Sequence, residues 1–160
     1  MPQTELDLAE ERARAALGRW EPRSLGVVRA GSAAEFVRAA GETTRHFVDP
    51  GHPAFVIHPM YVVSLLRAEP GVGVEELRPD GMYRDEVPGT DGLDVRLMAG
   101  GQEVRWTGDV RPGDRIDVRR AVTAVQRKGA APGFLLITVD KTYTTGRGLL
   151  AEVTERFIVR

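Results

Sequence analysis

The second half of the chain alternates apolar and polar residues over long stretches, and this period-two pattern limits the possible folds more than any other feature. The alternating stretches are 93–97, 103–107, 116–124, 134–143 and 149–159. Such alternation predicts strands with one buried face. Residues 111–114 (RPGD) carry Pro and Gly where a type II turn needs them, and residues 145–148 (TGRG) predict a tight turn. Short connections of this kind join antiparallel strands, so we expect an antiparallel sheet.

The first part of the chain predicts two helices around one short strand. Residues 5–19 place apolar side chains at helical spacing, which predicts a weakly amphipathic helix on the outside of the fold. Residues 24–30 predict a short strand. Ser32 and Glu35 have the spacing of a capping box at the start of a second helix, and Gly41 suits the left-handed residue that closes it.

A third helix is predicted at about 59–68. Pro59 fits its first turn, and residues 69–71 (EPG) end it. Apolar residues occupy most of its sides, and a helix of that kind is normally buried. The predicted architecture is therefore α+β, with an antiparallel sheet wrapped around one central buried helix.

The segment 42–58 (ETTRHFVDPGHPAFVIH) joins the second and third predicted helices and holds all three histidines of the chain. Polar residues concentrated between two helices indicate a functional loop. Asp49 is placed to initiate a turn, and His58 is placed to cap the third helix with a ring nitrogen. The histidines at 46, 52 and 58 lack the i, i+4 spacing of a helical metal site, and the chain has no cysteine. We therefore expect neither a metal nor another cofactor.

Composition excludes several classes of protein. Lys and Arg total 22 against 23 Asp and Glu, so no broad cationic surface is available for nucleic acid. No apolar run approaches the roughly 20 residues of a membrane span, and the first 20 residues lack the apolar core of a signal peptide. We expect a soluble cytoplasmic protein with one domain over 1–160, in which residues 1–23 are a helical extension and residues 24–160 form the core.

Cationic residues are frequent in the strand half of the chain. They lie at positions 105, 111, 115, 119, 120, 127 and 128. Strand alternation alone places such residues on a solvated outer face, and this is the interpretation we prefer. The alternative is that some of them contact the phosphates of coenzyme A or the acidic surface of an acyl carrier protein.

The order of short strand, helix, polar loop, buried helix and four long strands resembles the hot-dog fold. Residues 36–44 (FVRAAGETT), 48–50 (VDP), 55–61 (FVIHPMY), 101–106 (GQEVRW) and 111–115 (RPGDR) are similar to successive motifs of the MaoC-like hydroxyacyl-thioester dehydratases. Within that family the chain resembles the N-terminal-type domain related to the fatty-acid-synthase dehydratase. The resemblance covers about residues 24–160.

The resemblance implies an enzyme that dehydrates a 3-hydroxyacyl thioester or hydrates the enoyl thioester. The family uses an aspartate and a histidine on the loop, and backbone N–H groups at the start of the buried helix polarise the thioester carbonyl. Here the aspartate position holds Glu42 and the histidine position holds Phe47, with His46 one residue earlier. The implied roles are base for Glu42 and acid–base partner for His46, with His58 as an alternative partner. The residues that the resemblance places around the substrate are Thr44, which stands at the family's asparagine position, Phe47, Asp49, His52, His58, Met60 and Tyr61.

Two other functions stay open. One is a catalytically silent hot-dog subunit that pairs with an active dehydratase chain, and the other is a hot-dog thioesterase or cyclase that tailors a polyketide intermediate. The substrate carrier would be coenzyme A or an acyl carrier protein. Because the sheet has open edges, we expect a homodimer or a heterodimer with another hot-dog chain, with the substrate slot at the interface.

Overall fold

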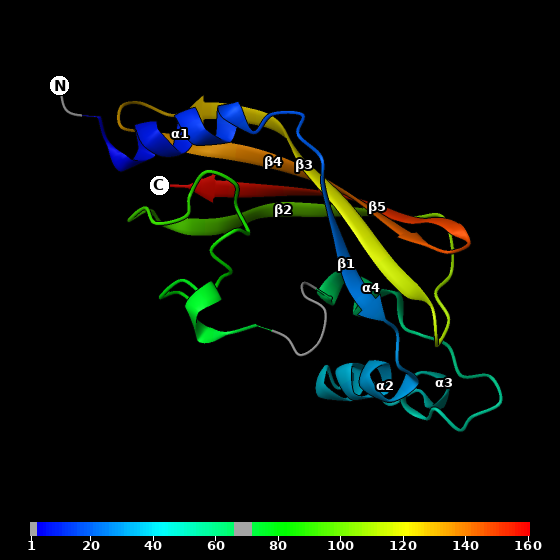
Figure 1. The fold of residues 1–160 in the computed structure, drawn as a ribbon. Helices are drawn as coiled ribbons and strands as arrows, with labels where there is room; N and C mark the ends of the chain where they lie inside the picture. Colours follow the sequence, from blue (N-terminus) through cyan, green and yellow to red (C-terminus); the bar gives the residue numbers. More distant parts are fainter. Residues whose placement is uncertain (1–2, 66–71) are drawn as a thin grey trace.

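Five antiparallel strands form a single sheet. The computed structural model describes residues 3–65 and 72–160. The strand order is β1-β3-β4-β5-β2 (Figure 1). The strands are β1 (Glu21–Val27), β2 (Leu97–Trp106), β3 (Arg115–Lys128), β4 (Phe134–Thr145) and β5 (Gly148–Val159). The predicted antiparallel sheet is confirmed.

The first residues of β1 and β2 differ from the predicted strand bounds. β1 begins at Glu21, three residues before the predicted strand. Leu93 and Val95 are buried as predicted but precede β2, which begins at Leu97. The predicted type II turn is confirmed, because Gly113 has a φ of 90° and the Asp114 N–H donates to the Arg111 carbonyl at 3.1 Å.

The helices are α1 (Glu5–Ala15), α2 (Ala30–Ala39), α3 (Arg45–Val48) and α4 (Pro59–Ser64), with a 3₁₀ turn η1 at Val74–Glu76. Across residues 3–65 and 72–160, none has the length and apolar character to cross a membrane.

The predicted capping box of the second helix is wrong. α2 starts at Ala30, two residues before Ser32, with Arg29 at the N-cap and no side-chain cap. The reason is tertiary: Val28 exchanges backbone hydrogen bonds with Asp114 and Gly113, both at 2.8 Å, and this pairing fixes where the helix can begin. Gly41 closes the helix with a φ of 84°, as predicted.

α4 is shorter than the predicted helix. It ends at Ser64, and Leu65 is already extended with φ −75° and ψ 105°. The rest of the predicted helix, 66–68, and its EPG terminator at 69–71 lie outside the described residues. Tyr61 and Val62 are buried, whereas 43% of Met60 is exposed. The helix is therefore buried on the side of Tyr61 and Val62 only, and the prediction that it is buried on nearly all sides is wrong.

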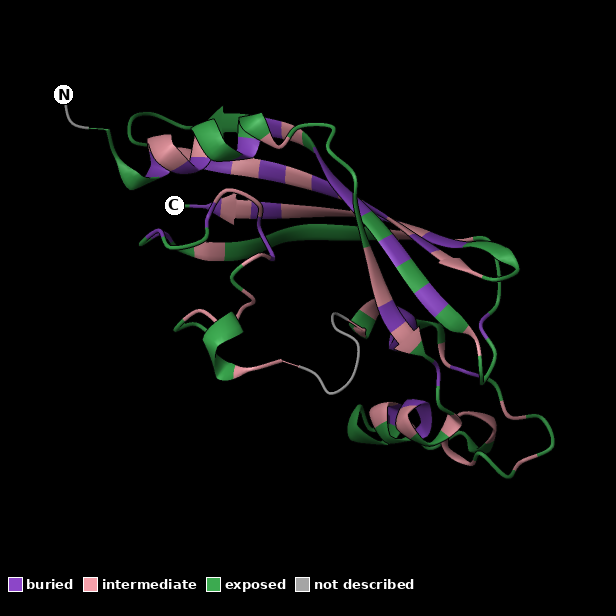
Figure 2. Ribbon diagram, viewed as in Figure 1, coloured by how far each residue is buried: buried purple, intermediate pink, exposed green. Residues whose placement is uncertain are grey.

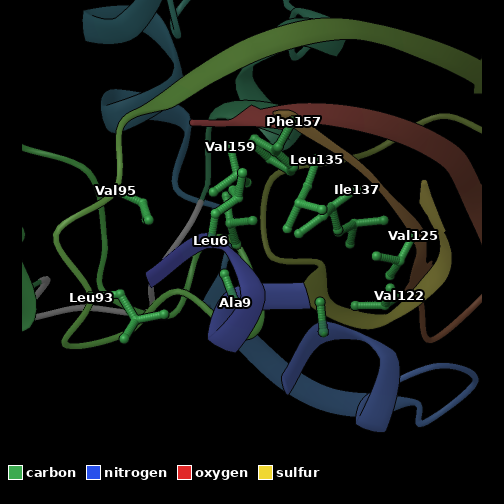
Figure 3. Packing of buried hydrophobic residues seen from close by; sticks show 13 residues of the cluster. Leu6, Ala9, Leu93, Val95, Val122, Val125, Leu135, Ile137, Phe157 and Val159 are labelled. Carbon is green, nitrogen blue, oxygen red and sulfur yellow. The ribbon is translucent and has the colours of Figure 1, made fainter. Parts of the chain in front are cut away.

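Helices α1, α2 and α4 pack on one face of the sheet, and the strand residues that point toward this face are buried. Figure 2 shows buried positions recurring along β3 and β4. At one end of this face α1 packs against the sheet through Leu6, Ala9 and Ala13 (Figure 3). The strand residues of this first apolar cluster are Val122, Val125, Leu135, Ile137, Val139, Phe157 and Val159.

A second apolar cluster lies at the other end of the same face. Ala33 of α2 and Tyr61 and Val62 of α4 belong to it. Its strand residues are Leu25, Ile116, Val118, Tyr143, Leu150, Ala151 and Val153. α4 therefore anchors the polar loop 42–58 to the sheet.

Candidate functional site

Glu42 is held at the start of the polar loop by three hydrogen bonds to one carboxylate oxygen. Its Oε1 accepts from the Thr43 N–H at 2.8 Å, the Thr44 N–H at 2.7 Å and the Thr44 hydroxyl at 2.6 Å. These bonds, with the Thr44 hydroxyl as the largest cause, lower the pKa of Glu42 below its ordinary value. The carboxylate is therefore ionised at neutral pH. Within the described residues its Oε2 makes no hydrogen bond, so this oxygen is available to a substrate.

Phe47 contacts two histidine rings. Its ring centroid is 4.2 Å from that of His46 and 4.9 Å, edge-on, from that of His58. The charge of His58 is the smallest of the causes that lower the pKa of Glu42. Phe47 therefore joins His46 and His58 by ring contacts, and in the described part of the chain neither histidine shares a hydrogen bond with Glu42.

His58 is the N-cap of α4, as predicted. Its Nδ1 accepts the Met60 N–H at 3.2 Å. A neutral imidazole that accepts at Nδ1 carries its proton on Nε2, so His58 presents an N–H donor away from the helix.

The backbone N–H groups at the start of α4 are largely occupied. Pro59 has no N–H, the Met60 N–H is bonded to His58 Nδ1, and the Tyr61 N–H donates to the His58 carbonyl at 3.0 Å. The first three helical residues therefore offer no unused N–H group to a thioester carbonyl. The His58 N–H makes no backbone hydrogen bond within residues 3–65 and 72–160, so the expectation that the backbone near 58–61 holds the thioester oxygen stays a prediction.

Asp49 and His52 shape the tip of the loop. Asp49 accepts the Gly51 N–H at 3.0 Å and pairs with Arg45 at 3.2 Å, which confirms its role in a turn. His52 Nδ1 accepts the Ala54 N–H at 3.1 Å. Neither residue has a recorded contact with Glu42 or His58 in the described chain.

The remaining predicted residues lie on opposite sides of α4. The Tyr61 ring is buried and packs against Phe36 with centroids 5.7 Å apart, so it is part of the hydrophobic core. Met60 is exposed. Thr44 acts through Glu42, to which it donates.

A groove of about 450 Å³ runs beside the start of α4. It is lined by Phe55, Val56, Ile57 and Pro59 on one side and by Trp106 and residues 108–112 on the other. Glu42 and His46 are not among its lining residues. This groove lies beside the 55–59 end of the loop, and the predicted substrate slot at an interface between two chains stays a prediction.

The sequence analysis missed a buried group of charges in the middle of the covered sheet face. Lys141 Nζ lies 2.6 Å from Glu155 Oε2 and 3.3 Å from Glu86 Oε1. Arg120 donates to the Asp85 carbonyl at 2.7 Å. Arg120 and Lys141 are only 7% and 6% exposed.

A signal for these charges was present in the sequence. Arg120 and Lys141 occupy inward positions of their strands, where the alternation otherwise calls for apolar residues. The interpretation of Arg120 as part of a solvated outer face is wrong. It is right for Arg105, Arg111 and Arg115, which are exposed and pair with Glu152, Asp109 and Asp117.

The chain matches one protein-family model and is similar in fold to several solved structures. A family model described as "FAS1-like, dehydratase domain region" matches residues 15–152. A chain of the ChsH1-ChsH2 complex from Mycobacterium tuberculosis is 18% identical with a TM-score of 0.66, over 96% of this chain and 90% of that one. No protein with a curated description matches.

Two further structures have a similar fold. The MaoC-like dehydratase from Phytophthora capsici is 17% identical with a TM-score of 0.66, over 92% of this chain and 50% of that one. The C-terminally truncated HadBC (3R-hydroxyacyl-ACP dehydratase) complex from Mycobacterium tuberculosis is 18% identical with a TM-score of 0.58, over 89% and 96%. At these identities the structural likeness establishes the fold and not the activity.

Proposed function

Because the chain belongs to the family of FAS1-like dehydratase domain regions and has the hot-dog fold of MaoC-like dehydratases, we propose that it is a hydro-lyase acting on a 3-hydroxyacyl or enoyl thioester of coenzyme A or an acyl carrier protein. The family match supports the reaction class. The observation in this chain that carries the proposal is that the polar loop 42–58 begins with a hydrogen-bonded, ionised carboxylate, Glu42, and ends with an imidazole, His58, whose Nε2–H is a donor.

Glu42 acts as the base. In dehydration its Oε2 takes the α-proton, and the C–H electron pair forms the double bond as the β-hydroxyl leaves. The three hydrogen bonds to Oε1 keep the carboxylate ionised and fix its direction. They also weaken it as a base, so we expect slow turnover.

His58 acts as the acid. Its Nε2–H gives a proton to the leaving hydroxyl, which departs as water, and hydration runs through the same steps in reverse. We prefer His58 to His46 because the bond from Met60 sets the His58 tautomer and because His58, unlike His46, is among the causes that lower the pKa of Glu42. The alternative is the assignment that the resemblance implies, with His46 as the acid, and mutation of each histidine distinguishes the two.

A second candidate function is a catalytically silent subunit. The occupied N–H groups at the start of α4 favour it, because a dehydratase needs a donor for the thioester oxygen. Two of the similar structures are complexes of differently named chains, ChsH1-ChsH2 and HadBC. In this case the active carboxylate and histidine would come from another hot-dog chain.

Both candidates involve a hot-dog partner chain. The sheet ends in two open edges, β1 and β2, and β2 exposes most of its ten residues. An unpaired edge of this kind is a template for pairing with another strand. We propose that β2 joins the sheet of a second copy or of a related chain.

Hydration of an enoyl-CoA by the purified chain tests the proposal. Loss of the enoyl-thioester absorbance in the wild type, abolished by Glu42→Gln, supports an enzyme that uses Glu42. Unchanged turnover in Glu42→Gln rules out Glu42 as the base. No turnover by the wild type, together with turnover after a second hot-dog chain is added, supports the silent subunit.

A further inference from the structure

A second cavity lies at the other end of α4 from His58. It has a volume of about 260 Å³ and lies on the covered face of the sheet. Leu65, the residue that ends α4, forms part of its wall, together with Glu86, Arg120, Lys141 and Tyr143. Its wall thus combines charged side chains with apolar residues of the second cluster, among them Leu25 and Val118.

Two donors at this cavity are not fully used. An ammonium group has three hydrogens, and Glu155 and Glu86 account for two contacts of Lys141. Tyr143 is 2% exposed, and its hydroxyl makes no hydrogen bond within residues 3–65 and 72–160. Burial raises the pKa of Tyr143, so the hydroxyl stays protonated and remains a donor. The cavity therefore offers donors to an acceptor atom.

The charges around the cavity select against an anion. Three cations, Arg23, Arg120 and Lys141, face four carboxylates, and the pairs are already formed. Glu21 and Glu86 line the cavity, and Asp85 and Glu155 pair with its cations from behind the lining. A further carboxylate or phosphate would add to a site whose net charge is already negative. A purely aliphatic chain would remove water from these groups without replacing its hydrogen bonds.

A neutral oxygen atom adds no negative charge and accepts a hydrogen bond from the donors of the cavity. We propose that this cavity binds a keto or hydroxyl oxygen on the distal part of the acyl chain, so that the substrate is an oxygenated acyl thioester. This inference rests on the proposed function, which places the thioester near His58. The six residues of α4 span about 9 Å, a distance that a medium-length acyl chain covers.

The test compares matched acyl chains and matched tyrosine variants. Binding of decanoyl-CoA, 9-oxodecanoyl-CoA and the dicarboxylic sebacoyl-CoA is measured by isothermal titration calorimetry with the full chain. Tyr143→Phe removes only the hydroxyl at the cavity. Tyr83→Phe is the control, because Tyr83 does not line this cavity.

The expected result is that the oxo thioester binds wild type about tenfold more tightly than decanoyl-CoA, and that sebacoyl-CoA binds no better than decanoyl-CoA. Tyr143→Phe should weaken binding of the oxo thioester about fivefold, the effect of one hydrogen bond, and leave decanoyl-CoA unchanged. Equal binding of the oxo and plain thioesters, or equal weakening of both by Tyr143→Phe, overturns the inference alone. If no thioester binds, the proposed function fails, and the inference fails with it.

Discussion

The hydroxyl of Thr44 donates to Oε1 of Glu42 at 2.6 Å, and it is the largest cause of the lowered pKa of that carboxyl. The resemblance to the MaoC-like family places Thr44 at an asparagine position and Glu42 at an aspartate position. The threonine therefore keeps the longer carboxylate ionised and in place, which links the altered loop to the proposed base.

Thr44→Val should raise the pKa of Glu42 toward its ordinary value, because the main bond to the charged form is lost. A base works only when ionised, so the acidic limb of the pH profile of kcat/KM should move to higher pH. Thr123→Val, on the exposed side of β3, is the control. An acidic limb that stays in place in Thr44→Val would show that another group sets it.

His58→Asn should lower kcat by about 10²–10⁴, because asparagine can keep the helix cap but cannot supply the proton. His46→Asn should have a much smaller effect, since His46 contacts Phe47 and is not among the causes that lower the pKa of Glu42. Steady-state hydration of an enoyl-CoA by the two variants measures the difference. The opposite ranking would assign the acid to His46, as the sequence predicts.

The strands could be predicted from sequence because their signals are local. Period-two alternation and the RPGD turn depend on neighbouring residues, and both agree with β3, β4, β5 and Gly113. The start of α2 could not be predicted in this way. It depends on backbone bonds between Val28 and Asp114, residues far apart in the sequence, and these override the Ser32–Glu35 pattern.

The site could be predicted in part. The loop holding Glu42 and His58 stands out in the sequence because it holds all three histidines. Which histidine affects the pKa of Glu42 depends on how Phe47 packs against the two rings, and no spacing rule gives that. The buried charges were detectable in principle, since Lys141 interrupts an otherwise apolar inward row of β4.

Lys141→Met should destabilise the fold by about 3–5 kcal/mol, because Glu86 and Glu155 would be left buried without their cation. Urea denaturation followed by circular dichroism measures this loss. The triple variant Lys141→Met, Glu86→Gln, Glu155→Gln should recover much of the stability, since its buried groups are neutral. A single variant as stable as wild type would show that these ion pairs are not desolvated enough to matter.

α1 packs closely against Gly89 in the loop before β2. Gly89 has a φ of 93°, and a Cβ there would lie 2.7 Å from the Ala13 N and 2.9 Å from the Ala9 carbonyl oxygen. Gly92 has a similar φ of 72° but open space around it. Gly92→Ala therefore measures backbone strain alone, which we expect to cost about 1–2 kcal/mol.

Gly89→Ala adds a clash with the backbone of α1 to the same strain. Because α1 cannot move without exposing Leu6 and its neighbours, we expect a total loss of about 3 kcal/mol or more. Urea midpoints of the two glycine variants give the comparison, and amide hydrogen exchange should show α1 opening earlier in Gly89→Ala. Equal losses in the two variants would mean that α1 does not pack closely on residue 89 in solution.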